Sequence, residues 1–153
     1  MKELVEKLIK ENKTISTMES CTGGGVANAI TNIPGASEIL KFSAVTYSNE
    51  FKIKMGVSSY IIDKYSVYSM ETANEMSKNI SMFTSSTYGV GITGKLLRSD
   101  PNNPYGMDNI VYISIYDSVN DKYYNSTIKA IKDTREDNKQ LVIDEIVRMI
   151  MAI

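Results

Sequence analysis

The spacing of apolar and polar residues predicts helices alternating with short strands in the first part of the chain. Residues 2–12 carry apolar positions at helical spacing, and residues 14–18 are rich in the β-branched residues typical of a strand. A glycine-rich turn and a helix over 26–30 follow. A strand that passes through a tight turn into a helix is the unit from which α/β folds are built.

The middle of the chain predicts a second strand over 39–47, although residues 38–41 also fit a helical turn. Short helices are expected over 48–55 and from Ser58 or Ser59 to about residue 65. Ser48 or Asn49 is the expected N-cap of the first. A longer helix is expected to begin at Ser69, which stands before an acidic first turn.

The last part predicts a strand over 88–93, a hairpin of strands over 110–116 and 122–131, and a closing amphipathic helix over 134–153. Between the first two strands lies a loop over 94–108, and loops longer than about 12–15 residues are usually functional or mobile. The element order predicts an α/β fold, a three-layer sandwich of helices around a mixed β-sheet. We expect one domain over residues 1–153.

Composition narrows the class of protein. The chain is 42% hydrophobic and 23% charged, which is ordinary for a soluble globular protein. A net charge of −1 argues against broad nucleic-acid binding, and the apolar stretches are too short to cross a membrane. One cysteine allows no intramolecular disulfide, and no signal-peptide pattern opens the chain. A cytoplasmic location is therefore expected.

The chain contains no histidine. This excludes a Ser-His-Asp or Cys-His hydrolase within the chain and zinc sites of the Cys/His type. If the protein performs nucleophilic chemistry, the base must be a lysine, a tyrosine, a carboxylate or a water molecule.

The segment 19–24, Glu-Ser-Cys-Thr-Gly-Gly, is the first candidate for chemistry. Ser20 stands at a strand-to-helix turn, where its hydroxyl is exposed and the backbone N–H groups of the helix start can hold a phosphate or an oxyanion. A capped, glycine-rich helix start without any chemical role explains the same residues equally well. Cys21 is expected to be a buried packing residue, because no histidine is available to form its thiolate.

Three further groups of residues are candidates. Tyr47 and Lys52 follow the second strand, and a lysine acts as a base only where desolvation or neighbouring cations lower its pKa. Thr93 and Gly94 stand at a strand end, where α/β proteins collect ligand sites, and Arg135 near the last helix can bind phosphate or carboxylate. A solvated helix start and a surface arginine are the commoner explanations of Lys52 and Arg135.

The order and spacing of these segments resemble the CinA C-terminal domain family, which includes stand-alone nicotinamide mononucleotide deamidases. The resemblance is carried by residues 17–24, 34–37, 45–52 and 91–94, with Arg135 before the last helix. It covers nearly the whole chain. The separate N-terminal domain of longer family members has no counterpart in these 153 residues.

The resemblance implies an amidohydrolase that converts nicotinamide mononucleotide into nicotinate mononucleotide and ammonia, without a metal or cofactor, as a step of bacterial NAD salvage. It implies Ser20 as nucleophile and Lys52 as base, with Tyr47 nearby. It also implies a nucleotide as the small-molecule partner and a homodimer or higher homo-oligomer, with no role for nucleic acid or membrane. The implied substrate-binding residues are Thr22, Gly23, Gly24, Ser48, Asn49, Thr93, Gly94 and Arg135.

The chain departs from the family pattern after Gly94. The family continues with Ile-Ala-Gly-Pro and a glycine-rich stretch, whereas residues 95–104 here lack those glycines and add Lys95 and Arg98. The nucleophile segments are intact. A second hypothesis therefore stays open, in which the protein binds a nucleotide or a protein partner without turnover.

Overall fold

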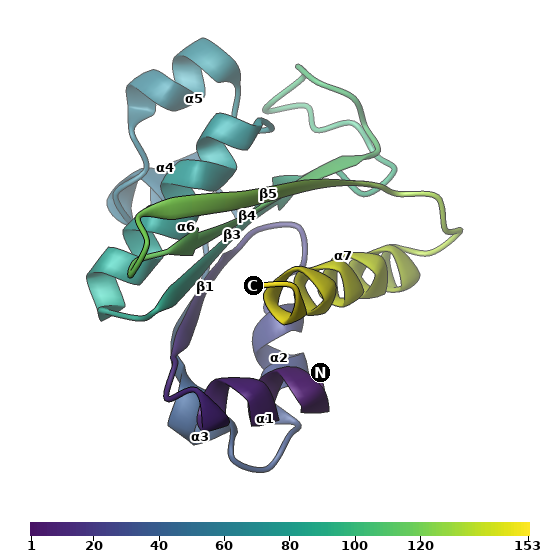
Figure 1. Ribbon diagram of the computed structural model, residues 1–153. Helices are drawn as coiled ribbons and strands as arrows, with labels where there is room; N and C mark the ends of the chain where they lie inside the picture. Colours follow the sequence, from purple (N-terminus) through teal and green to yellow (C-terminus); the bar gives the residue numbers. More distant parts are fainter.

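The computed structural model describes residues 1–153 and contains a five-stranded mixed sheet between two layers of helices (Figure 1). The strands are β1 (Ile15–Glu19), β2 (Leu40–Val45), β3 (Tyr88–Gly94), β4 (Ile110–Asp117) and β5 (Lys122–Lys129). The helices are α1 (Lys2–Lys10), α2 (Gly25–Thr31), α3 (Ala36–Ile39), α4 (Asn49–Lys54), α5 (Ser59–Tyr65), α6 (Met70–Thr84) and α7 (Arg135–Met151). The predicted α/β fold with a mixed sheet is confirmed.

The sheet has the order β2-β1-β3-β4-β5. Strands β1, β2 and β3 run parallel to one another, whereas β4 and β5 are antiparallel to their neighbours. Every residue of β1 is buried, as is typical of a parallel strand covered on both faces. Because β1, β2 and β3 are parallel, their carboxyl ends meet at one edge of the sheet, where ligand sites of α/β folds are found.

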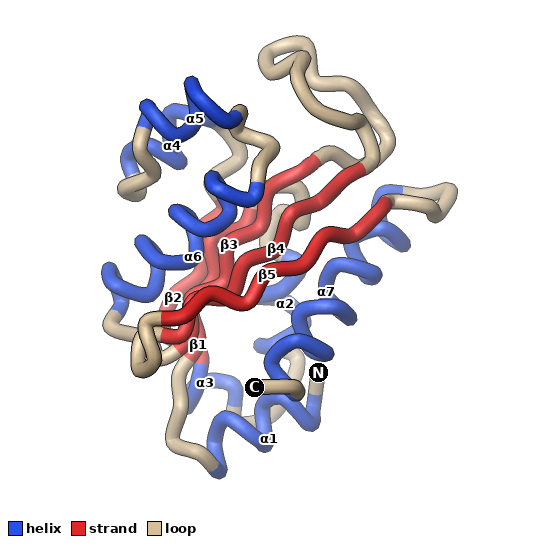
Figure 2. Tube along the Cα trace, turned by 45° about the horizontal axis from the view of Figure 1, so that its top comes forward, coloured by secondary structure: helices blue, strands red, loops and turns tan.

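Helices cover both faces of the sheet, as Figure 2 shows. Helices α1, α2, α3 and α7 lie on one face, over a core cluster of 22 buried residues that includes Leu8, Ile30 and Ile146. Helix α6 lies on the other face with α4 and α5, over a smaller cluster that includes Met18, Met76 and Ile80. The larger cluster accounts for most of the apolar burial, so the first face is the main core.

Two helix starts follow the predicted capping residues. The hydroxyl oxygens of Ser48 and Ser69 accept hydrogen bonds from backbone N–H groups in the first turns of α4 and α6, and Thr134, expected inside the last helix, caps α7 in the same way. Strand β2 ends at Val45, two residues before the predicted end. It ends there because the chain turns away from the sheet to reach the cap of α4 at Ser48.

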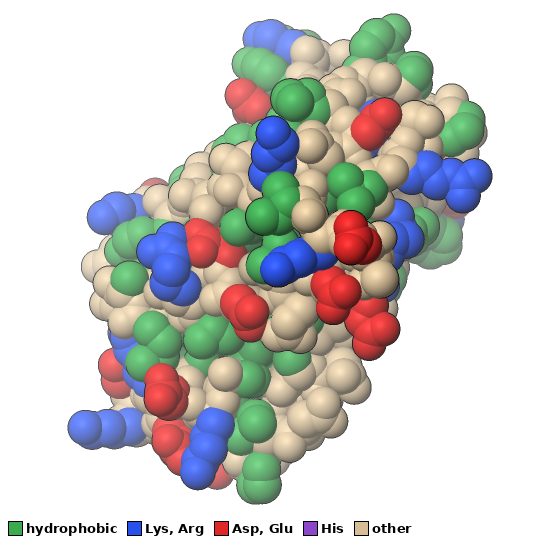
Figure 3. Space-filling model, turned by 90° about the vertical axis from the view of Figure 1, so that its right-hand side faces the viewer, with side chains coloured by type: hydrophobic (Ala, Val, Ile, Leu, Met, Phe, Trp, Pro, Cys, Tyr) green, Lys and Arg blue, Asp and Glu red, His purple; other side chains and the backbone are tan.

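Charge is dispersed over the protein face in Figure 3, where acidic and basic side chains lie among one another and form no continuous basic stripe. None of the seven helices has the length and apolarity that a membrane span requires.

Candidate active site

The turn between β1 and α2 holds Ser20 at the carboxyl edge of the sheet. Gly23 and Gly24 have φ values of 62° and 90°, in the left-handed region that favours glycine. The N–H of Gly23 donates to the carbonyl oxygen of Ser20 at 2.9 Å, which closes the turn. The sequence Thr-Gly-Gly therefore sets the path of the backbone directly after the serine, and Ser20 itself is only 6% exposed.

The N-terminus of α2 is occupied by the carboxylate of Glu19, the residue before Ser20. This carboxylate accepts hydrogen bonds from the N–H groups of Gly24, Val26 and Ala27 at 3.1, 3.1 and 2.9 Å. The hydroxyl of Thr17 donates to it at 3.3 Å. The expectation that the helix-start N–H groups hold an oxyanion or a phosphate is therefore wrong for these three groups, because a buried side chain of the protein already uses them.

Other donors in the turn have no protein partner. The N–H groups of Cys21 and Thr22 donate no hydrogen bond to another part of the protein. The hydroxyl oxygens of Thr22 and Thr46 are buried without a hydrogen-bond partner. Unsatisfied buried polar groups are uncommon, and these two stand two residues after Ser20 and at the residue whose carbonyl oxygen accepts from Lys52 Nζ.

Lys52 brings its amine to Ser20 from α4. Its Nζ lies 3.1 Å from Ser20 Oγ and donates a 2.6 Å hydrogen bond to the carbonyl oxygen of Thr46. The residue is only 2% exposed. Burial without a carboxylate partner lowers the pKa of Lys52 from 10.5 to about 8, because desolvation disfavours the ammonium form. At pH 7 roughly a tenth of this amine is neutral and can accept a proton, and the neutral fraction reaches about one half at pH 8.

Cys21 follows Ser20 and differs from it chemically. Burial raises the pKa of its thiol to about 12, so the thiolate does not form at neutral pH. The sulfur packs in the main core cluster. Cys21 is a packing residue, as the sequence predicts.

Tyr47, Ser48 and Asn49 line the cleft with Ser20, but none of their side chains has a hydrogen bond to Ser20 Oγ or Lys52 Nζ. Tyr47 is 66% exposed, and Arg135 Nη2 approaches its hydroxyl at 3.5 Å. Ser48 caps α4, and Asn49 Nδ2 donates to Asn103 Oδ1 at 2.8 Å. Tyr47 is therefore placed to contact a ligand, while a proton relay from Ser20 through Tyr47 has no hydrogen bond to follow.

Thr93 and Gly94 end β3, and only Gly94 lines the cleft. The hydroxyl of Thr93 is buried and donates to the carbonyl oxygen of Val67 at 2.8 Å. A Cβ on Gly94 would lie 2.4 Å from the carbonyl oxygen of Ile110, so glycine is required there by the neighbouring strand β4. The structure thus gives Thr93 a packing role and leaves the backbone of Gly94 facing the cleft.

The cleft has a volume of about 850 Å³, within the range of small-molecule sites. One wall carries Ser20 and the residues between β2 and α4. The other is the loop over 95–109, which contributes Lys95, Arg98 and the residues 99–103. Arg135 joins the walls, since its Nη1 donates to the carbonyl oxygen of Leu96 at 3.1 Å. The protein contains no group of three His, Cys, Asp or Glu side chains suited to a metal ion.

Two of these features are not visible in the sequence motifs. Glu19 acts through three backbone N–H groups, and Thr46 holds Lys52 through its carbonyl oxygen. The one available signal for Glu19 is an acidic residue directly before a glycine-rich helix start, where a carboxylate is favoured.

Comparison with known proteins gives one consistent family. The sequence model of the CinA C-terminal domain matches residues 1–153. A CinA-like protein of Desulforapulum autotrophicum is 40% identical over 108 residues, which cover 69% of this chain and 26% of that protein. A CinA-like protein of Endomicrobium trichonymphae is 34% identical over 149 residues, or 95% of this chain and 34% of that protein. The chain thus spans about a quarter to a third of the length of these curated relatives.

Solved structures agree with the fold. The competence/damage inducible protein CihA from Agrobacterium tumefaciens superposes with a TM-score of 0.85 at 25% identity, covering 99% of this chain and 93% of that one. A CinA superfamily protein from Escherichia coli gives a TM-score of 0.85 at 22% identity, covering 98% of this chain and 86% of that one, and supports the fold alone. The family match over the whole chain and the shared fold establish that this chain belongs to the CinA C-terminal domain family.

Proposed function

We propose that the protein is an amidohydrolase that converts nicotinamide mononucleotide into nicotinate mononucleotide and ammonia, with Ser20 as nucleophile and Lys52 as base. One observation carries this proposal. The Nζ of Lys52 is buried, lies 3.1 Å from Ser20 Oγ and has a pKa lowered to about 8 by desolvation. A surface lysine would stay protonated and would not take a proton from a hydroxyl.

The reaction consists of two acyl transfers. The neutral amine of Lys52 accepts the proton of the Ser20 hydroxyl as Oγ attacks the carboxamide carbon. The C–N bond then breaks, and the Lys52 ammonium returns the proton to the leaving nitrogen, which departs as ammonia. Water next attacks the ester, with Lys52 accepting a proton from it. The C–Oγ bond then breaks as the Lys52 ammonium returns this proton to Oγ, which gives the carboxylic acid, the Ser20 hydroxyl and the neutral amine. The sum is one amide and one water giving one acid and one ammonia.

The oxyanion of each tetrahedral intermediate needs hydrogen-bond donors near Ser20. The N–H groups of Cys21 and Thr22 are free of protein acceptors, whereas that of Gly24 is held by Glu19. We therefore assign oxyanion binding to Cys21 and Thr22, with the unpartnered hydroxyl of Thr22 beside them. One such donor contributes roughly 3–4 kcal/mol of transition-state stabilisation.

Ammonia release from nicotinamide mononucleotide tests the proposal. Ser20→Ala and Lys52→Ala are each expected to reduce kcat by at least about a thousandfold, since members of a catalytic unit fail together. Lys54→Ala is the matched control, because Lys54 lies on the same helix, is exposed and pairs with Glu50. The rate of this variant is expected to equal that of the wild type.

The pH dependence gives a second test. The wild-type rate of ammonia release should rise with pH up to about pH 8, as Lys52 loses its proton. Unchanged turnover by Ser20→Ala would refute the mechanism.

A second candidate function rests on the loop over 95–109, which replaces the glycines of the family pattern. In this second function, the protein binds a nucleotide but does not convert it. Titration of nicotinamide mononucleotide alongside the ammonia assay separates the two functions. Saturable binding with no ammonia released by the wild type would favour the second function over the first.

A further inference from the structure

The cleft contains two arginines without an acidic partner. Arg98 stands on the loop after β3, and Arg135 is the first residue of α7. Neither takes part in any ion pair of the protein. The third cation of the cleft, Lys95, is neutralised, because its Nζ pairs with Asp108 at 3.1 Å and lies 5.0 Å from the centre of the Tyr68 ring.

The single acidic residue of the cleft lining does not compensate these arginines. The carboxylate of Asp100 accepts hydrogen bonds from the hydroxyl of Tyr68, from Asn103 Nδ2 at 2.9 Å and from the N–H of Asn102 at 2.9 Å. These bonds, that of Tyr68 first, hold the pKa of Asp100 below its usual range. The Asp100 carboxylate is thus ionised and is hydrogen-bonded to its own loop and to Tyr68, so the two arginines leave the cleft with uncompensated positive charge.

The position of Arg135 fixes where this charge lies. Its Nη1 donates to the carbonyl oxygen of Leu96, two residues before Arg98, and its Nη2 approaches the hydroxyl of Tyr47. A guanidinium has five N–H donors, so most donors of Arg135 remain free after these contacts. The contact ties the start of α7 to the loop that carries Arg98.

We propose that Arg98 and Arg135 form the subsite for the phosphate monoester of the substrate, and that Arg98 determines the preference of this chain for a 5′-phosphorylated nucleotide over the corresponding nucleoside. Planar guanidinium groups bind phosphate oxygens in a bidentate manner, which a lysine does not reproduce. The kinetic part of this proposal rests on the proposed amidase function, whereas the binding of the phosphate does not.

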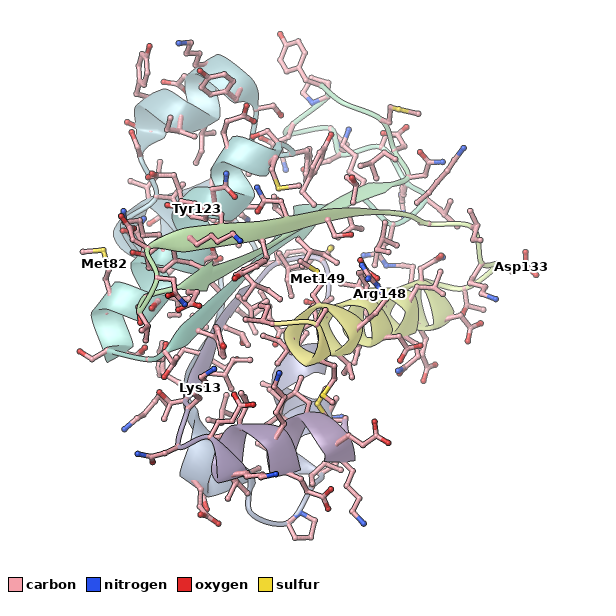
Figure 4. The ribbon with its side chains drawn as sticks, in the orientation of Figure 1. Lys13, Met82, Tyr123, Asp133, Arg148 and Met149 are labelled. Carbon is pink, nitrogen blue, oxygen red and sulfur yellow. The ribbon has the colours of Figure 1, made fainter.

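Binding is tested with ribose 5-phosphate, which carries the phosphate but no amide, by calorimetric titration. Arg98→Ala is expected to weaken the affinity by about tenfold or more, since charged hydrogen bonds are lost. Arg98→Lys should restore only part of it. The matched control is Arg148→Ala. Arg148 lies on α7 (Figure 4), outside the cleft lining, and pairs with Glu145. Its variant should bind like the wild type.

Kinetics give the second measurement. Arg98→Ala should raise the KM for nicotinamide mononucleotide by about tenfold with little change in kcat, and should leave kcat/KM for nicotinamide riboside unchanged. If ribose 5-phosphate binds through Arg98 but no amide is hydrolysed, the phosphate subsite stands and the amidase function fails. If Arg98→Ala binds ribose 5-phosphate like the wild type, or if Arg148→Ala weakens binding equally, the subsite proposal is wrong.

Discussion

The wall of the cleft that carries Ser20, whose hydroxyl lies 3.1 Å from the buried Nζ of Lys52, differs from the wall over residues 95–109 in the contacts that hold its side chains. Around the first wall Glu19, Ser20 and Lys52 are all buried. The Glu19 carboxylate meets backbone N–H groups at the start of α2, and Lys52 Nζ meets the carbonyl oxygen of Thr46 and Ser20 Oγ. On the second wall only Lys95 and Leu96 are buried, and the remaining residues of the loop are partly or fully exposed. The first wall is part of the folded core, whereas the second is a largely exposed loop on the surface of that core.

This difference explains which part of the site can change in sequence. A nucleophile and its base must keep hydrogen-bond distance, so they stand on elements whose backbone is fixed by the sheet. Recognition of a substrate group needs only the right charge at the right place, which an exposed loop can supply. This contrast fits the resemblance read from the sequence, in which the Ser20 and Lys52 segments follow the family pattern and residues 95–104 depart from it.

The largest effect is expected for Glu19→Ala, which tests whether the first wall depends on its buried carboxylate. The change leaves the three N–H groups at the start of α2 without an acceptor, and each unmade buried hydrogen bond costs about 1–3 kcal/mol. We expect a loss of about 4 kcal/mol in the free energy of unfolding, measured by urea denaturation. Glu19→Gln, which keeps one amide oxygen as acceptor, should lose about half of that.

The control for this comparison is Glu71→Ala. Glu71 also stands in the first turn of a helix, α6, but is exposed. An exposed acid at a helix start contributes only about 0.3–1 kcal/mol. If Glu19→Ala is no less stable than Glu71→Ala, the turn holding Ser20 does not depend on the carboxylate, and the contrast between the two walls is lost.

The second-largest effect is expected for Lys52, which makes the free energy of unfolding depend on pH. Its pKa is about 8 in the folded protein and 10.5 in the unfolded chain, so between these values the unfolded state binds more protons and stability rises with pH. Below about pH 8 the ammonium is charged in both states, and its burial costs the fold about 3 kcal/mol, from 1.36 kcal/mol per pKa unit.

Comparison with Lys52→Met isolates this contribution, because all other groups titrate alike in both proteins. From about pH 7 to about pH 10.5 the wild type should gain about 3 kcal/mol of unfolding free energy relative to Lys52→Met. Lys54→Met, which changes an exposed lysine on the same helix, should show no such difference. Parallel stability curves for the wild type and Lys52→Met would mean that Lys52 is not desolvated in solution.

The order of elements could be predicted from the sequence because each has a local signal. The apolar spacing of α7 and the serine caps of α4 and α6 depend only on residues within one or two helical turns. Thr93 shows the limit of such signals. A hydroxyl at a strand end predicts a cleft residue, but the structure directs it to the carbonyl oxygen of Val67, 26 residues earlier in the chain. Which neighbour a side chain meets depends on packing between distant segments.

The residues of the candidate site also differ in how well the sequence predicts them. Ser20 and Lys52 are identified by short motifs and their resemblance to a family. The role of Glu19 has only a weak sequence signal, an acidic residue before a glycine-rich helix start, because its partners are backbone N–H groups. The contact of Arg135 with the carbonyl oxygen of Leu96 joins residues 39 apart. The loop over 95–109 has no periodic pattern, so its charges, but not their arrangement, are visible in the sequence.

The smallest effect is expected on the loop wall, for Tyr68→Phe. Tyr68 is half-buried, and desolvation together with its hydrogen bond to Asp100 raises the pKa of its hydroxyl, so it stays a donor to that carboxylate. Its removal takes away one of the two hydrogen bonds to Asp100 Oδ2 and costs about 1 kcal/mol of stability. The bonds from Asn103 and Asn102 remain, so the loop stays attached.

Asp100 Oδ2, which then accepts one hydrogen bond fewer, can attract the unpaired guanidinium of Arg98, which lies two residues away in the chain and lines the same cleft. Competition of this kind should weaken the binding of ribose 5-phosphate by about threefold, as expected for an exposed ion pair of less than about 1 kcal/mol. The substitution should leave kcat for ammonia release unchanged, because Lys52 and Ser20 keep all their contacts.

The control is Tyr60→Phe, which changes an exposed tyrosine on α5. A fall in kcat with unchanged phosphate affinity would show that the loop wall also sets the geometry of the nucleophile, and the separation of chemistry from recognition would not hold.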